Sequence, residues 1–105
     1  MQRANFSRAR LNCDLSETRL NEADFRQANG SGSLFIRSDL SRANLRDANF
    51  IAAILQKCVL SGADLQGANL FRADLSQSQV DQATRLEAPA YRQVKTLPRH
   101  NGKEV

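Results

Sequence analysis

The sequence repeats every five residues over most of its length. From Cys13 to Val80 every fifth position holds a large apolar residue, and only Gly30 interrupts the series. The large residues are Leu15, Leu20, Phe25, Phe35, Leu40, Leu45, Phe50, Leu55, Leu60, Leu65, Leu70, Leu75 and Val80. Two positions before each of them lies a small residue, such as Ala43 or Ala48. So regular a repeat predicts a solenoid, in which each unit buries its apolar side chains against its neighbours.

A period of five fits neither an α-helix nor one continuous strand. On a helix, positions five apart advance by about 140° beyond a full turn, so the apolar residues would surround the cylinder. On a straight strand they would alternate between the two faces. We therefore expect the chain to bend once per repeat. The small and the large residue then point inward, and the residue between them, usually Asn or Asp, points outward and supports the turn.

The units that carry the pattern most clearly are Ala43-Asn44-Leu45, Ala48-Asn49-Phe50, Ala63-Asp64-Leu65, Ala68-Asn69-Leu70 and Ala73-Asp74-Leu75. Over roughly residues 4 to 83 the chain resembles the pentapeptide repeat family. The resemblance implies an all-β solenoid, a right-handed quadrilateral β-helix, here of about four coils with about 20 residues each. The spacing of Leu34 from Ile54, and of Ile51 from Phe71, agrees with such a coil. The stretch from Ala68 to Arg99 is also weakly similar to pentapeptide-repeat proteins associated with bacterial type VI secretion.

The repeat ends after Ala83. We expect residues 1–83 to form the β-helix and residues 84–105 to form a C-terminal cap and basic tail. Pro89 suits the first turn of a short helix, since proline is favoured at that position. The predicted cap spans Leu86 to Leu97 and would contact the last coil; an alternative is a dimerisation element. The residues expected to make the cap contacts are Leu86, Tyr91, Val94 and Leu97.

Two places break the repeat inside the predicted solenoid. One residue is missing between Leu11 and Leu15, which predicts a distorted corner near Asn12 and Cys13. Gly30 takes a slot for a large residue, so we expect either a void there or a bulge that brings Leu34 or Ile36 inward. The chain begins within the repeat, and three explanations remain open: a fragment of a longer protein, end-to-end dimerisation, or cover by another protein.

The cysteines and the single histidine give no sign of redox or metal chemistry. Cys13 and Cys58 both occupy small inward slots about two coils apart, so we expect reduced thiols that fill the core. The only histidine is His100 and no Cys-x-x-Cys spacing occurs, so we expect neither a metal nor another cofactor. No signal peptide or long apolar segment is visible, which predicts a cytoplasmic protein that does not enter a membrane.

The charge balance limits the functions that the resemblance suggests. Some members of the family mimic DNA with an acidic surface and inhibit type II topoisomerases. Here the net charge is +4, and most of the excess lies in the tail, with 5 Lys or Arg against 2 Asp or Glu in residues 84–105. DNA mimicry is therefore the disfavoured alternative. Binding of nucleic acid is not expected either, because stacking aromatics between basic residues are missing.

The remaining function is a non-catalytic scaffold for protein interactions, with a bacterial secretion system as one setting. The Asp side chains would be separate and solvated on a convex surface, so we expect no catalysis and no small-molecule substrate. A protein partner or a second copy would bind through an exposed coil end, the tail or a patch of outward apolar residues. Scattered exposure is the alternative interpretation of that patch. The candidate residues are Leu34, Ile51, Ile54 and Phe71.

Overall fold

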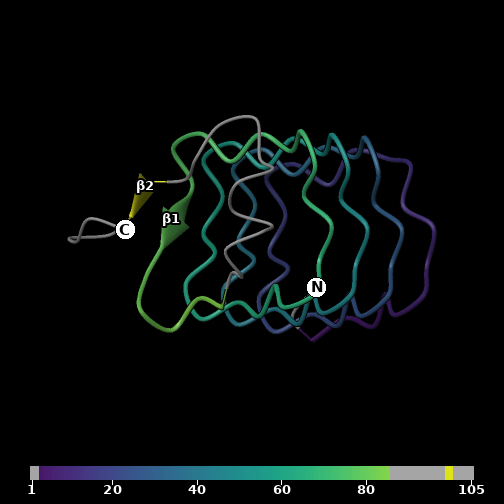
Figure 1. Ribbon diagram of the computed structural model, residues 1–105, viewed down its shortest axis with the longest axis horizontal. Helices are drawn as coiled ribbons and strands as arrows, with labels where there is room; N and C mark the ends of the chain where they lie inside the picture. The colour runs from purple at the N-terminus through teal and green to yellow at the C-terminus, as the bar shows by residue number, and fades with distance from the viewer. Residues whose placement is uncertain (1–2, 86–98, 101–105) are drawn as a thin grey trace.

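The chain winds into a stack of short coils. The computed structural model describes residues 3–85 and the backbone of residues 99–100. The N-terminal coil lies at one end of the stack, and strands β1 (Gln79–Val80) and β2 (Arg99–His100) lie at the other (Figure 1). These two strands pair in parallel, with Gln79 opposite Arg99 and Val80 opposite His100.

Successive coils are joined by parallel pairs of residues that lie 20 positions apart. Asp24 pairs with Asn44, for example, and Asn44 pairs with Asp64. The pairs stack into four columns, which gives each coil four sides, as the resemblance implies. The columns are Asn5–Asp24–Asn44–Asp64–Arg85, Arg10–Asn29–Asn49–Asn69, Asp14–Leu34–Ile54–Asp74, and Arg19–Asp39–Val59–Gln79–Arg99.

The large and the small residue of each unit fill the interior between the four sides. Phe25, Leu40 and Leu75 have no exposed surface, and the small residues Ala23 and Ala63 are buried as completely. Each buried Leu or Phe stabilises the fold by about 1.5–3 kcal/mol. Alanine in the small slots leaves room for side chains from the other walls. The predicted inward positions are confirmed wherever the coil has neighbours on both sides.

Each corner is a tight turn from the large residue of one unit to the small residue of the next. The amide of Ala43 donates to the carbonyl of Leu40 at 3.0 Å, and Arg42 between them has a φ of 58°. The outward Asn or Asp before the turn accepts a second bond: the amide of Ile51 donates to Oδ1 of Asn49 at 3.1 Å. Such Asx turns satisfy a corner amide that no coil-to-coil bond uses. This confirms the predicted role of the outward Asn and Asp residues.

The first corner is irregular, as the missing residue predicts. Arg10 pairs with Asn29, 19 positions away, whereas Asp14 pairs with Leu34, 20 positions away. Cys13 forms a bend at this place instead of a turn. The side chain of Cys13 is exposed, so the expectation that it fills the core is wrong; the shortened corner belongs to the first described coil, which has a neighbour on one side only. Both thiols are free, and Cys58 is buried as expected.

The last described coil contains one extra residue. Asp64 pairs with Arg85, 21 positions away. Asp81 organises the longer corner, because its Oδ1 accepts bonds from the amides of Gly62 at 3.2 Å, Ala83 at 3.0 Å and Thr84 at 3.1 Å. The hydroxyl of Thr84 in turn donates to the carbonyl of Leu60 at 2.7 Å.

The backbone at Gly30 is regular, and the slot above it is filled. A Cβ at Gly30 would lie 2.2 Å from Cε1 of Phe50, the corresponding residue of the next coil. The predicted void is therefore wrong, since the Phe50 ring extends into the space. The alternative bulge is also wrong: the amide of Gly30 donates to the carbonyl of Asn49 at 2.7 Å, and Leu34 keeps its outward place opposite Ile54.

The predicted C-terminal cap is not among the residues that the structure describes. Its residues Leu86, Tyr91, Val94 and Leu97 lie outside the described part of the chain. Within residues 3–85 and 99–100, no helix has the length and hydropathy that crossing a bilayer requires.

Candidate protein-contact surface

Two of the candidate apolar residues lie side by side on one face of the β-helix. Leu34 and Ile54 are parallel partners in adjacent coils, so their Cα atoms are separated by about 4.8 Å. Both side chains are half-buried. Asp14 and Asp74 continue the same column, one coil beyond them on either side. The column thus has an apolar centre and acidic ends.

The other two candidates share the corner before this face. The amide of Gly32 donates to the carbonyl of Ile51 at 2.9 Å, and the amide of Ala52 donates to the carbonyl of Phe71 at the same distance. Ile51 and Phe71 therefore hold the same corner position in successive coils. Ile51 is half-buried, whereas Phe71 is 49% exposed. We refer to Leu34, Ile51, Ile54 and Phe71 together as the corner patch.

The apolar residues at the centre of the face depart from the rule that shapes the other corners. Most residues in this outward position are Asn or Asp that bond a corner amide, as Asp74 does for Ser76 at 3.0 Å. Leu34 and Ile54 have no side-chain acceptor. The amide of Ile36 is instead bound by the hydroxyl of Ser16 at 3.0 Å. Leu34 and Ile54 therefore occupy this position without stabilising the turn that follows.

Sequence reasoning missed the small residues that leave the corner patch open. Gly32 and Ala52 occupy the turn position that holds Arg42, Glu22 or Lys57 at other corners. An added Cβ at Gly32 would meet no atom within 4 Å, and Ala52 is exposed. No long side chain therefore rises between the Ile51 corner and the Leu34 face in these two coils. The sequence contained this information, because Gly32 and Ala52 stand two positions after Gly30 and Phe50, where most other units have a longer side chain.

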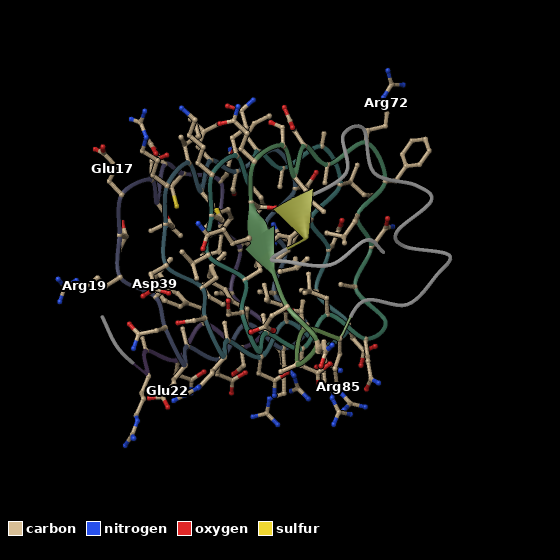
Figure 2. All side chains as sticks on the ribbon, turned by 90° about the vertical axis from the view of Figure 1, so that its left-hand side faces the viewer. Glu17, Arg19, Glu22, Asp39, Arg72 and Arg85 are labelled. Atoms are coloured by element: carbon tan, nitrogen blue, oxygen red, sulfur yellow. The ribbon has the colours of Figure 1, made fainter. Side chains whose placement is uncertain are left out.

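Cations flank the patch, and sequence reasoning, which places them at corners, did not connect them with it. Arg72 follows Phe71 at one corner, and its side chain points away from the ribbon (Figure 2). Lys57 is exposed at the opposite corner of the face, next to Arg37. Arg37 approaches Glu17 at 3.9 Å, whereas neither Lys57 nor Arg72 lies within salt-bridge distance of a carboxylate in residues 3–85.

A second group of cations lies at another corner, and two of its three members are paired with carboxylates there. Arg8, Arg26 and Arg46 line a shallow groove of about 390 Å³ together with Asp47. Arg26 pairs with Asp24 at 2.7 Å, and Arg46 pairs with Asp64 at 3.3 Å. The Arg26 guanidinium also holds the pKa of Asp24 below its usual value. The charges of this groove balance locally, so it has little attraction for an anion.

The buried thiol of Cys58 is unreactive at neutral pH. Burial raises the pKa of the Cys58 thiol to about 12, so the thiolate is not formed at neutral pH. The thiol donates to the carbonyl of Phe35 and fills its slot in the core. In the part of the chain that the structure describes, no three His, Cys, Asp or Glu residues gather closely enough to hold a metal ion.

The chain matches the family model described as pentapeptide repeats (8 copies) over residues 13–50 and 43–78, more than half of its length. No curated protein matches it with significant similarity. The weak likeness to proteins associated with type VI secretion has no support from these matches and stays a prediction.

Solved structures with a similar fold include HetL and QnrB1. HetL, a pentapeptide repeat protein involved in heterocyst differentiation regulation from the cyanobacterium Nostoc sp. strain PCC 7120, is 29% identical with a TM-score of 0.50. That alignment covers 80% of this chain and 40% of HetL. A trypsin-treated variant of QnrB1, a plasmid-mediated fluoroquinolone resistance protein, is 20% identical with a TM-score of 0.54. Here the alignment covers 81% of this chain and 54% of QnrB1, so the chain spans about half the length of these relatives or less.

The five-residue repeat, the four columns of paired residues and the family match agree with one another. The chain belongs to the pentapeptide repeat family, whose members fold as right-handed quadrilateral β-helices.

Proposed function

We propose that this protein is a non-catalytic scaffold that binds a protein partner through the corner patch. The observation that supports this most is the place of Leu34 and Ile54 in a column whose other members, Asp14 and Asp74, support the turn with a carboxylate. Apolar residues there give up a hydrogen bond to a corner amide. They add little to the core, since they point outward. Contact with a partner explains why apolar side chains are placed there.

The neighbouring corner adds to the same surface. Phe71 is the large apolar residue with the greatest exposure among those the structure describes, and Ile51 lies beside it in the preceding coil. Aromatic and branched apolar side chains at the centre of a contact usually carry most of its binding energy. Together the four residues form a surface suited to an apolar anchor from another protein.

Inhibition of a type II topoisomerase by DNA mimicry remains the weaker candidate. It requires a continuous acidic stripe along the rod. In the column that contains Asp24 and Asp64, each carboxylate pairs with an arginine of the adjacent corner, so the column is not an acidic stripe. A supercoiling assay with purified topoisomerase tests this candidate, and we expect no inhibition.

The scaffold proposal is tested by the double substitution Ile54→Asp and Phe71→Asp. The wild type and the variant are compared by size-exclusion chromatography with light scattering and by selection from an unbiased peptide display library. Gln27→Asp with Gln82→Asp is the matched control, since it adds the same charge at exposed corners that do not border the Leu34 face. Loss of self-association or of selected peptides only in the patch variant supports the proposal. An unchanged oligomeric state together with unchanged peptide selection contradicts it.

A further inference from the structure

The corner patch is bordered by positive charge on both sides. Arg72 lies at the corner that carries Phe71, and Lys57 and Arg37 lie at the corner where the Leu34 face ends. Lys57 and Arg72 have no carboxylate partner within residues 3–85. The carboxylates of the Leu34 column, Asp14 and Asp74, lie on the midline of the face, one coil beyond the apolar pair. The patch is thus an apolar strip with Lys57 and Arg37 along one border and a single cation, Arg72, at the end of the other.

The dimensions of this strip suit an α-helix that lies along the axis of the solenoid. From Ala52 to Lys57 the chain crosses the face in five steps, which spans at most about 16 Å. A helix with its side chains is about 10–12 Å wide and fits between the borders. One turn of a helix rises about 5.4 Å, close to the spacing of about 4.8 Å between coils. Apolar residues one turn apart on such a helix would each meet one coil, first at Leu34 and then at Ile54.

The open corner allows a helix to approach this closely. Gly32 and Ala52 lie between the Ile51 corner and the Leu34 face, and neither has a side chain that would hold the helix away. Further along the same corner the position is filled by Arg72, whose long side chain reaches outward (Figure 2). The helix would therefore contact apolar side chains on its underside, meet Lys57 and Arg37 on one flank, and meet Arg72 at the end of the other.

We propose that the occupant of the corner patch is an amphipathic helix of a partner protein, with an apolar stripe bordered by Asp or Glu. This inference rests on the proposed scaffold function and specifies the chemistry of the partner. Complementary charge at the rim of an apolar contact steers the encounter and excludes partners with like charge. A basic helix of the same apolar stripe is accordingly rejected.

The test is a selection from a display library of helical peptides with a fixed leucine stripe. Each flanking position varies among Glu, Gln and Lys. On the wild-type protein we expect Glu to be enriched over Lys at the flanks by tenfold or more. On the variant Lys57→Glu with Arg72→Glu the preference inverts toward Lys. Reversal of two cations at other places, Arg42→Glu with Arg85→Glu, leaves the wild-type preference unchanged.

The outcomes separate this inference from the scaffold proposal beneath it. If peptides are enriched without a preference for Glu, the proposal of an acidic helix is wrong. It is also wrong if the charge reversal at Lys57 and Arg72 does not alter the preference. In both cases the proposal that the corner patch binds an apolar partner is unaffected. If Ile54→Asp with Phe71→Asp selects the same peptides as the wild type, the corner patch is not the contact surface, and both proposals fail.

Discussion

The ring of Phe50 occupies the space directly above the α-carbon of Gly30 in the preceding coil. A Cβ on Gly30 would lie 2.2 Å from Cε1 of that ring, far inside contact distance. The ring also packs edge-on against Phe35, with centroids 5.4 Å apart, and against Phe25 at 6.3 Å. Gly30 is therefore part of an aromatic cluster in the core, where the absence of a side chain allows one large ring to tilt toward it.

This relationship predicts that a side chain at Gly30 is tolerated only when Phe50 becomes smaller. Gly30→Ala overpacks the core and lowers the free energy of unfolding by about 1–3 kcal/mol. Phe50→Leu restores the residue type of Leu70 in the same stack and provides space for a side chain at position 30. In a double-mutant cycle followed by urea unfolding, the double variant should be more stable than the sum of the single effects. Strict additivity would show that the ring does not fill the slot.

The left-handed backbone at the corners predicts opposite effects for two neighbouring substitutions. Ala52 has a φ of 58° and Gly32 has a φ of 70° at the same position one coil earlier. Residues other than glycine are strained there by about 1 kcal/mol. Ala52→Gly should therefore raise the free energy of unfolding and Gly32→Ala should lower it, each by about 1 kcal/mol or less. Since a Cβ at Gly32 meets no atom, steric clash does not confuse the comparison. Effects of the same sign would contradict the prediction.

The two cysteines should differ sharply in reactivity. Cys13 is exposed, whereas Cys58 is buried and its pKa is raised from 9.0 to about 12. In the native protein we expect one thiol to react with a disulfide reagent at neutral pH, and the second to react only after unfolding in guanidinium. The variant Cys13→Ser should show no reactive thiol before unfolding. Rapid reaction of that variant would mean that the core around Cys58 opens readily.

The stabilising contribution of Asp81 should be lost in acid. Burial would raise the pKa of this carboxyl, but hydrogen bonds from Gly62, Thr84 and Ala83 lower it below the usual 3.8. The folded state then binds fewer protons than the unfolded state, so the stabilisation is present above about pH 3.8 and is lost as the pH falls through the folded pKa. Asp81→Asn removes this dependence while leaving one acceptor oxygen. The difference in unfolding free energy between wild type and variant should shrink as the pH falls from about 6 to about 3. A constant difference would argue against the contribution.

The repeat predicted most of the fold because the period itself determines which residues point inward. The pairing of Leu34 with Ile54 followed from their spacing, and the turn role of residues such as Asn49 followed from their chemistry. The filling of the Gly30 slot did not follow, since it depends on the tilt of a ring from another coil. The exposure of Cys13 did not follow either, because the pattern gives a slot and not whether a neighbouring coil covers it.

The candidate surface was predictable in part. Its apolar members were recognisable as exceptions to the outward polar pattern. Its borders were not, since the significance of Lys57 and Arg72 depends on which of the other charges have partners. Arg26 has the same charge in the sequence, yet it is neutralised by Asp24 at 2.7 Å. Only the side-chain geometry separates these two kinds of cation.

The central claim is that Leu34 and Ile54 serve contact with a partner and not the stability of the fold. Its most direct test is the variant Leu34→Asn with Ile54→Asn, which places the usual turn support at both positions. At position 54 the new amide oxygen can accept a corner hydrogen bond worth about 0.5–1.5 kcal/mol, which offsets lost apolar burial. At position 34 it shares the amide of Ile36 with the hydroxyl of Ser16, so the gain there is smaller. The control Asn49→Leu makes the reverse exchange in the neighbouring column and removes an existing bond of 3.1 Å.

The measurement is the free energy of unfolding of each variant, taken together with its binding of peptides selected on the wild type. We expect the double Asn variant to keep its stability within about 1 kcal/mol and to lose binding. The Asn49→Leu control should lose about 1 kcal/mol of stability and keep binding. A double Asn variant that unfolds easily yet binds as the wild type does would contradict the account.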